Sequence, residues 1–478
     1  MSLTSSAWLP IERAAGDLEG QVYREMRDRI LSGHIAAGQR LPSTRALAAS
    51  LGLARSTIVN AYERLKAEGY LEATTGSASR VALLSMSPFE VSHAPPLPPP
   101  AAAAPTAHEM LLEPGVPDLS DFPHAVWARY LASRARALRI HDLGYGDACG
   151  ILDLRVAIVE HLSATRGVTA LPEQVLVVPS TRVAIDLLAS LRLRAEGSDI
   201  AWVEEPGYPA AKSLLRAAGA RLVPVPCDES GIDVSQAEGP PPRLIYVTPS
   251  HQYPTGATMT LKRRLALLEM AQARGALVLE DDYDSDFQYG SRPIAALQGI
   301  DRHDVVAYLG TFSKILAPGL RVAYAVVPSW LVADASAALR MRGAAVSIHI
   351  QAALADFIRD GRLRVHLRQM NAKYAEKMTA TIQALTRHCG HLLDVGSGSG
   401  GLQLATWFHD TAAEDETVAA ALRLRGMAPQ SMSRFHLGAP RPGLLFGIAR
   451  VEPSDIDSVA SKLSRLLDEH FAAIPARR

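Results

Sequence analysis

A proline-rich segment divides this chain of 478 residues into two parts that must fold separately. Seven prolines and four consecutive alanines lie between Ser85 and His108. Proline fixes φ and removes a backbone donor, so such a run holds no stable helix and behaves as a semi-stiff tether. We therefore predict a front domain over 1–84, a linker over 85–108 and a large domain over 109–478.

Charge and cysteine content indicate in which compartment the protein works and how it could contact nucleic acid. Lys and Arg number 49, as do Asp and Glu, so any contact with nucleic acid must come from a local patch. The three cysteines (Cys149, Cys227 and Cys389) lack paired or metal-like spacing, which indicates a reducing compartment. The N-terminus does not resemble a signal peptide, and the most apolar stretch, 322–339, contains a proline and an aspartate. We expect a cytoplasmic protein without membrane contact.

The front domain has the pattern of a winged helix-turn-helix. Apolar residues at helical spacing predict a helix over 18–31, a second helix capped by Ser43 and a third over 55–68. Short strands at 70–73 and 80–81 complete the plan as a hairpin.

The third helix has the features of a DNA reader. Between Gly33 and Asn60 there are three arginines and no acid. The residues expected to contact DNA are Arg45, Arg55, Ser56 and Thr57. The alternative is a small docking domain with solvated arginines, which ten basic against eight acidic side chains over 1–84, net +2, do not exclude. The wing and the basic helix together favour binding of a double-stranded DNA operator.

In the large domain, short apolar runs alternate with helical stretches, which predicts an α/β fold with a mainly parallel, doubly wound sheet. The expected strands are 174–178, 200–203, 244–247, 276–279, 305–309 and 321–327.

The block from Gly310 to Lys314 follows one of these strands, at the edge where open α/β sheets bind ligands. Lys314 supplies an amine for a Schiff base. Thr311 and Ser313 supply hydroxyls and Arg321 a cation, all suited to a phosphate. Together these groups suggest pyridoxal 5'-phosphate.

Acidic residues follow the strand at 276–279. Asp281 is placed to pair with the pyridine nitrogen of such a cofactor, and Tyr283 to donate to its phenolate oxygen. A solvated turn or a metal site is the alternative, but a metal needs further ligands at the same strand ends, and none is evident.

Three more strand ends supply loops to the same site. Ser180 and Thr181 open a helix whose N-terminus forms a phosphate cradle. Tyr208 follows the strand at 200–203 and is suited to stacking on a cofactor ring, and the loop 249–256 follows the next strand. Each loop alone is ordinary turn chemistry. Five of them on one predicted sheet indicate a binding site.

The front domain resembles the GntR family of winged-helix regulators, through the segments 41–45 and 61–71. Two positions depart from that family's pattern. Ala54 stands where the serine that caps the recognition helix is usual, and Ala78 replaces the second glycine of the wing.

The whole chain resembles the MocR subfamily, which joins such a winged helix to a fold-type I aminotransferase-like domain. The blocks 250–256, 280–284 and 310–314 carry the resemblance. It implies a smaller C-terminal α+β subdomain and a Schiff base on Lys314. It also implies a domain-swapped, head-to-tail homodimer in which Tyr145 reaches the partner's cofactor phosphate.

The pattern departs from amino-acid aminotransferases at the carboxylate clamp. The late strand 444–449 contains no arginine, and Arg441 is the nearest candidate to contact an effector, with a surface role as its alternative. Ala210 stands where some amino-acid-sensing relatives have an arginine, and Ser180 where relatives usually have glycine. The glycines at 396–401 have dinucleotide-motif spacing, but a strand-like run follows, which predicts a turn.

These features favour a transcription factor whose large domain binds pyridoxal phosphate and senses a small amine. A catalytically active aminotransferase with an appended DNA-binding domain is the alternative. A sensor of pyridoxal phosphate itself is a third hypothesis.

Overall fold

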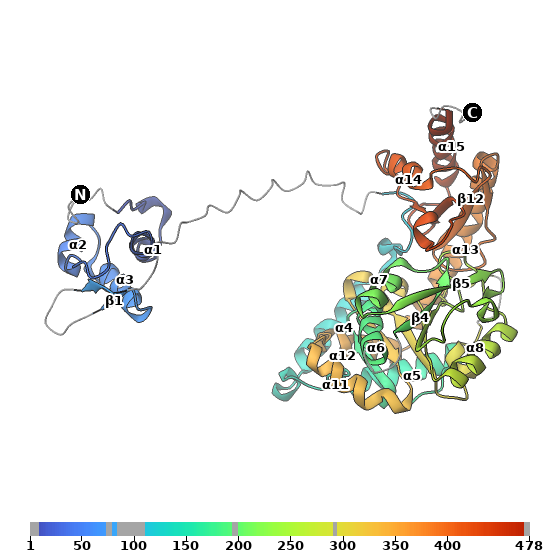
Figure 1. Ribbon diagram of the computed structural model, residues 1–478, viewed down its shortest axis with the longest axis horizontal. Helices are drawn as coiled ribbons and strands as arrows, with labels where there is room; N and C mark the ends of the chain where they lie inside the picture. Colours follow the sequence, from blue (N-terminus) through green and yellow to red (C-terminus); the bar gives the residue numbers. More distant parts are fainter. Residues whose placement is uncertain (1–8, 73–78, 84–109, 194–198, 290–293, 473–478) are drawn as a thin grey trace. The chain divides into compact units, whose positions relative to one another are not determined.

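The computed structural model describes residues 9–72, 79–83, 110–193, 199–289 and 294–472. These residues belong to two compact units, one within 1–104 and one within 105–478 (Figure 1). The segment 85–108, the turn of the predicted hairpin and Ala78 lie outside the described residues. The domain boundaries at 84 and 109 therefore stay a prediction.

The first unit has the predicted winged helix-turn-helix. Its elements are α1 (Leu18–Leu31), α2 (Thr44–Leu51), α3 (Arg55–Ala67), β1 (Leu71–Glu72) and β2 (Arg80–Val81). Val22, Met26 and Ile58 are fully buried between the helices. The Ser43 hydroxyl accepts a hydrogen bond from the Ala46 amide at 3.2 Å, the predicted N-cap of α2.

The second unit is built, among the described residues, on an eight-stranded sheet of order β3-β10-β9-β8-β7-β4-β5-β6. The strands are β3 (Val175–Val178), β4 (Ile200–Glu205), β5 (Arg221–Asp228), β6 (Gly231–Ile232), β7 (Leu244–Val247), β8 (Leu277–Asp282), β9 (Val306–Thr311) and β10 (Ala323–Val326). The central strands β9, β8, β7, β4 and β5 are parallel, as predicted.

Two features of the sheet differ from a simple parallel reading. Strand β10 runs antiparallel to both β9 and β3, because the segment 312–322 is too short for the crossover that a parallel strand needs. Strand β5 was not among the predicted strands, since it contains Pro224 and Pro226. Prolines are tolerated there because only the short β6 lies beyond it.

Helices cover both faces of the sheet, so its strands are apolar on both sides. Leu176, Val203 and Leu279 point toward α6, α7 and α11, whereas Val177, Trp202 and Val278 point toward helices on the other face. The helices of this part are α4 (His124–Ala137), α5 (Leu152–Arg166), α6 (Thr181–Leu193), α7 (Pro209–Ala217), α8 (Leu261–Arg274), α9 (Leu297–Ile300), α10 (Phe312–Ile315), α11 (Val332–Arg342) and α12 (Ile348–Arg359).

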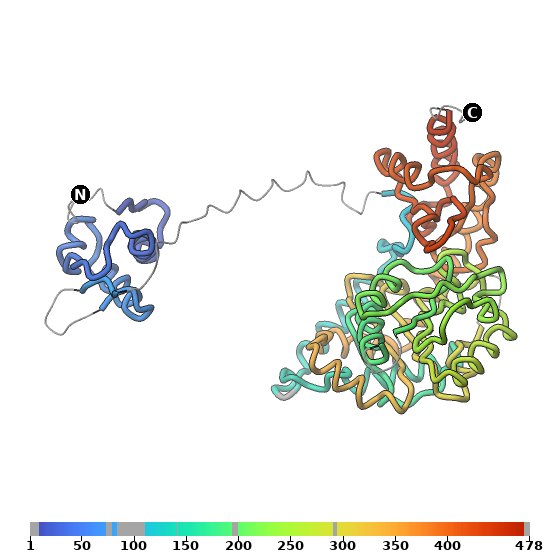
Figure 2. The backbone as a smooth tube through the Cα atoms, in the orientation of Figure 1, coloured from blue at the N-terminus to red at the C-terminus, as the bar shows by residue number. Residues whose placement is uncertain are grey.

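A smaller α+β subdomain follows, as the family resemblance implied. Its chain is drawn in orange to red in Figure 2. Its four-stranded antiparallel sheet has the order β11-β12-β14-β13. The elements are α13 (Arg362–Cys389), β11 (Leu393–Val395), β12 (Gln403–Phe408), α14 (Asp415–Arg423), β13 (Gln430–Ser431), β14 (Gly443–Gly447) and α15 (Ile456–Ala472). The glycines at 396–401 form a turn before β12, so the prediction of a turn is confirmed.

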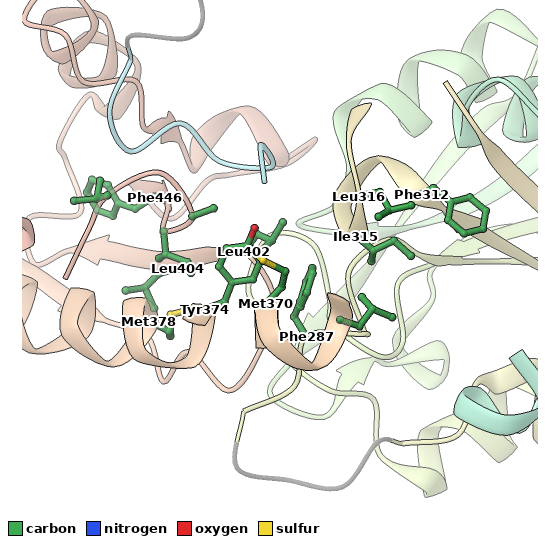
Figure 3. Close-up of a cluster of buried hydrophobic side chains, with 14 of the residues drawn as sticks. Phe287, Phe312, Ile315, Leu316, Met370, Tyr374, Met378, Leu402, Leu404 and Phe446 are labelled. Carbon is green, nitrogen blue, oxygen red and sulfur yellow. The ribbon is translucent and has the colours of Figure 1, made fainter. Parts of the chain in front are cut away.

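The long helix α13 joins the two sheets through its buried face. Figure 3 shows Met370, Tyr374 and Met378 at four-residue spacing, with Leu404 of the small sheet beside them. The Phe287 ring, from the segment after β8, meets the Tyr374 ring edge-on with centroids 4.9 Å apart.

No helix among the described residues is long and apolar enough to cross a membrane.

Candidate functional site

A cavity of about 460 Å³ lies where the parallel strands end. Residues that follow β4, β7, β8 and β9 converge on it, as expected for an open α/β sheet. Nine residues singled out in the sequence line this one cavity: Ser180, Thr181, Tyr208, Asp281, Tyr283, Thr311, Ser313, Lys314 and Arg321.

Lys314 lies in α10, directly after β9, and its side chain is partly buried. Its Nζ donates a hydrogen bond to the Gly115 carbonyl. Gly115 has φ +78°, and a Cβ there would come within 3.1 Å of Nζ, so glycine leaves room for the amine. Burial lowers the pKa of Lys314, although the Asp284 and Asp281 carboxylates oppose this shift. A lowered pKa favours the neutral, nucleophilic amine.

Asp281 lies at the end of β8 and is 4% exposed. Its Oδ2 accepts a hydrogen bond from the Tyr246 hydroxyl at 2.6 Å, whereas its buried Oδ1 has no partner in the described structure. Burial raises the pKa of Asp281 to about 6, although the hydrogen bond from Tyr246 opposes this shift. A buried acceptor without a donor is unfavourable, so the cavity is suited to a ligand that presents a cationic N–H.

The Tyr283 hydroxyl has two polar side chains beside it. Gln403 Nε2 donates to it at 2.9 Å, and His251 Nδ1 lies 3.0 Å away. His251 Nδ1 also lies 2.9 Å from Asp284 Oδ1, so its proton is shared toward that carboxylate. Burial disfavours the charged His251 ring, but the Asp284 carboxylate outweighs burial and the pKa of His251 is raised. Because Gln403 already donates to its oxygen, Tyr283 can direct its own proton into the cavity.

The glycine turn before β12 fits closely against this arrangement. Gly401 has φ +73°, and a Cβ there would lie 2.1 Å from His251 Cε1 and 2.5 Å from Asp284 Oδ2. The Gly401 amide also donates to the Phe287 carbonyl at 2.8 Å. The turn therefore holds His251 and Asp284 in place, a role that dinucleotide spacing did not reveal.

Hydroxyls and an arginine gather at one end of the cavity. Ser180 precedes α6 and Thr181 begins it, which directs free backbone amides at the same space. The Thr311 hydroxyl accepts from the Ser313 amide at 3.1 Å. Arg321 has φ +53°, a left-handed conformation that costs a non-glycine residue about 1 kcal/mol. Arg321 adopts this conformation at the wall of the cavity, which it lines.

Two sequence-predicted residues do not line the cavity. Arg441 lies on the exposed surface, where its Nη2 is 3.1 Å from Asp394 Oδ2 and its guanidinium is 5.0 Å from the centroid of the Trp407 ring. Its position favours the surface role, and its contact with an effector stays a prediction. Tyr145 is fully exposed on this single chain, so its expected contact with a partner stays a prediction.

Two arginines that line the cavity were missed as ligand contacts. Arg434 follows β13 at the cavity wall, and Arg182 donates to the Tyr208 hydroxyl at 3.2 Å through Nη2. Arg182 directly follows Thr181, so its position in the sequence was a usable signal. Arg434 gave none, because only the fold of the small subdomain brings it to the cavity.

The residues predicted to contact DNA lie in the first turns of α2 and α3. Arg45, Arg55 and Ser56 are exposed and Thr57 is half-buried. Within the described residues neither Arg45 nor Arg55 has an ion-pair partner. Ala54 occupies the N-cap position without a side-chain hydrogen bond, as its identity predicted. The first turn of α3 therefore presents backbone amides and the Arg55 guanidinium to water, and the first turn of α2 presents the Arg45 guanidinium. Such groups are suited to phosphates.

Comparison with known families and structures agrees with both units. Residues 18–81 match the family model of bacterial regulatory proteins of the gntR family, and residues 115–463 match aminotransferase class I and II. A kynurenine aminotransferase from Pyrococcus horikoshii superposes with a TM-score of 0.69 at 23% identity, over 76% of this chain and 92% of that one. The α-aminoadipate aminotransferase LysN from Thermus thermophilus gives 0.68 at 25% identity, over 77% and 94%.

Full-length relatives share both units. The probable rhizopine catabolism regulatory protein MocR of Rhizobium meliloti is 38% identical over 96% of each chain. The pyridoxine biosynthesis regulator PdxR of Corynebacterium glutamicum is 29% identical over 93% of this chain and 94% of its own. The order of the two matched families and this coverage show that the chain belongs to the MocR subfamily of GntR-type transcriptional regulators, with a DNA-binding winged helix joined to a fold-type I aminotransferase-like domain.

Proposed function

We propose that this regulator binds pyridoxal 5'-phosphate in the cavity around Lys314 and senses a small amine through it. The observation that carries the proposal is the buried Oδ1 of Asp281, an acceptor without a donor on the wall of a cavity that also contains a lysine. A protonated pyridine nitrogen supplies the missing cationic donor.

The chemistry of the other lining residues fits the rest of the cofactor. Tyr283 would donate to the phenolate oxygen, and Tyr208 would lie against the ring. The phosphate would be held by Ser180, Thr181, Thr311, Ser313 and Arg321. When bound, the cofactor supplies an electrophilic carbon and a ring that withdraws electrons. Lys314 would hold that carbon until an incoming amine takes its place.

Arg434 supports an effector that carries an acidic group. It is exposed at the wall of the cavity, and in the described residues it has no ion-pair partner. A guanidinium binds a carboxylate or another planar oxyanion with two hydrogen bonds. We therefore propose an amine with an anionic group, held by Arg434 rather than by Arg441.

Effector binding would be coupled to DNA binding. Release of Lys314 would change contacts in the cavity, and a homodimer would transmit that change to two winged helices on one operator. The full exposure of Tyr145 supports the head-to-tail dimer, in which this side chain contacts the partner.

The test compares wild-type protein with Lys314→Ala. Wild type should gain a visible absorbance band with the cofactor, and its affinity for operator DNA should change when the effector amine is added. Lys314→Ala should lose both, whereas Lys373→Ala, an exposed lysine of α13, should keep both. An unchanged effector response in Lys314→Ala would sink the proposal.

Two related functions give different results. An active aminotransferase would release a keto acid from amino acids in a single turnover, whereas a sensor would stop at the covalent complex. A sensor of the cofactor alone would change its DNA affinity on cofactor addition, without any amine. We rank the amine sensor first because the chain joins this domain to a gntR-type winged helix, as its regulator relatives do. The absence of an arginine from β14, whose residues 444–447 are all apolar or glycine, also departs from amino-acid aminotransferases.

A further inference from the structure

A second cavity shares a backbone segment with the first. Asp281 and Tyr283 line the first cavity, whereas Ser285, Asp286 and Gln288 line the second. Its volume, about 450 Å³, is close to the 460 Å³ of the first and large enough for a small metabolite. Helices α5 and α13 form its other walls. Nothing in the proposed function uses this cavity.

The α13 wall is strongly basic. Arg364 and Arg368 lie one turn apart, and both are exposed. In the described part of the chain neither has a hydrogen-bond or ion-pair partner. Two like charges at this spacing repel each other, so an anion between them would relieve the repulsion. Asn371, three residues further along, adds an amide to the same wall.

The wall formed by the segment after β8 has the opposite chemistry. Gln288 Oε1 is buried and has no hydrogen-bond partner. Burial raises the pKa of the neighbouring Asp286, although His161 and Arg166 oppose this shift. A half-buried carboxyl and a buried acceptor without a donor are both stabilised by a cationic N–H donor.

We propose that the second cavity binds a small zwitterion, with its carboxylate on Arg364 and Arg368 and its ammonium group on Asp286 and Gln288. An amino acid is the simplest molecule with both groups. No covalent step is involved, and the site does not depend on the cofactor.

Arg166 connects this site to the first cavity. It lines the second cavity, and its Nε donates to Asp282 Oδ2 at 2.9 Å while its Nη2 donates to Ser250 Oγ at 2.6 Å. Asp282 is the residue next to Asp281. A ligand in the second cavity would therefore lie beside the buried Arg166–Asp282 pair, one residue from Asp281.

The test uses cofactor-free, full-length Lys314→Ala protein, in which an amino acid cannot bind covalently through the first cavity. Calorimetric titrations with L-alanine, L-glutamine and 4-aminobutyrate are compared with propionate and ethylamine, which carry one charge each. At least one zwitterion should bind one site per chain, more tightly than either single-charge probe. Adding Arg364→Ala and Arg368→Ala should weaken that binding at least tenfold.

Three further variants decide which site is occupied. Arg274→Ala with Arg465→Ala removes two exposed charges elsewhere and should leave binding unchanged. Gln288→Leu, a change of similar volume, should weaken binding of the zwitterion but not binding of propionate. This variant also tests the proposal if the double arginine variant does not fold. Loss of binding in Arg434→Ala, equal loss in the charge control, or no zwitterion preference would each overturn the proposal. These results do not depend on whether pyridoxal phosphate binds, so the two proposals fail separately.

Discussion

At the first turns of α2 and α3 the charged side chains face water, whereas in the cavity beside β8 the carboxylate of Asp281 is buried. Arg45 and Arg55 are exposed without ion-pair partners among the described residues, and Asp281 is 4% exposed with one oxygen unpaired. A solvated guanidinium costs little to keep, so binding at α3 should depend on the number of charges and on salt. A buried unpaired acceptor is already desolvated, so binding in the cavity should depend on single atoms and on pH.

The largest expected effect comes from Asp281→Asn. Asparagine keeps the size of the side chain and still accepts from Tyr246, but it removes the charge that pairs with a cationic ligand. We expect the affinity for pyridoxal phosphate to fall by ~2–3 kcal/mol, roughly 30- to 150-fold. A fluorescence titration of cofactor-free protein measures the change. Equal affinity in the variant would mean that the unpaired oxygen plays no part in binding.

The same variant gives a pH test. Because burial raises the pKa of Asp281 to about 6 in the cofactor-free protein, wild-type affinity should fall as the pH drops through 6 and the carboxylate is protonated. The cofactor also titrates, so the measured quantity is the ratio of wild-type to variant affinity. That ratio should approach one below pH 6 and level off above it; a ratio independent of pH would place the pKa elsewhere.

The next effect tests the packing behind Tyr283. Gly401→Ala would push a Cβ into His251 and Asp284, as well as straining a backbone at φ +73°. Tyr283 should then donate less well, and a bound phenolate that loses a donor becomes more basic. We expect the midpoint of the cofactor's visible band to rise by up to about one pH unit, roughly tenfold in proton affinity.

Gly398→Ala is the matched control for that change. Gly398 has φ +59° in the same turn, but its Cβ would meet the flexible side chains of Ile382 and Met378. It carries similar backbone strain without touching His251. Equal shifts in both variants would show that the turn, and not the His251 contact, sets the cofactor's titration.

The contrast between the sites also explains what the sequence could predict. Residues at or just after the end of a strand were found from local pattern, because parallel strands end at one edge whatever their order. Lys314, Asp281 and Thr311 belong to this group. Tyr246 was hidden in an apolar run, since its hydrogen bond to Asp281 depends on the pairing of β7 with β8. Local periodicity contains no such information.

The small subdomain was the least predictable part of the site. Gln403 donates to Tyr283 across 120 positions of sequence, and Arg434 reaches the cavity from the segment after β13, a strand of two residues. Arg441 was chosen because it precedes the late strand. The structure instead pairs it with Asp394 on the surface. Contacts at such separations depend on tertiary packing.

At α3 the expected effects are smaller and depend on salt. Arg55→Ala should weaken binding to a duplex selected from a random pool by about fivefold, and lower the slope of log affinity against log salt by about one. Fluorescence anisotropy at several salt concentrations measures both. Arg27→Ala is the control, since Arg27 pairs with Asp28 at 2.7 Å in the same unit. If the loss of DNA affinity in Arg55→Ala did not vary with salt concentration, a contact between Arg55 and a phosphate would be contradicted.

The smallest expected effect is a gain. Ala54→Ser would supply the missing N-cap of α3, and its hydroxyl can accept from an amide of the first turn. A cap of this kind contributes ~0.5–1 kcal/mol, so amide exchange in the first turn of α3 should slow by about threefold in the full-length protein. Ala49→Ser, exposed within α2 and away from any cap position, is the control for the change of residue. If DNA affinity stays constant while exchange slows, the uncapped amides are not the phosphate contact. A fall in affinity with slower exchange would mean that DNA itself caps this helix, and α3 would then resemble the cavity in keeping a polar group unpaired for its ligand.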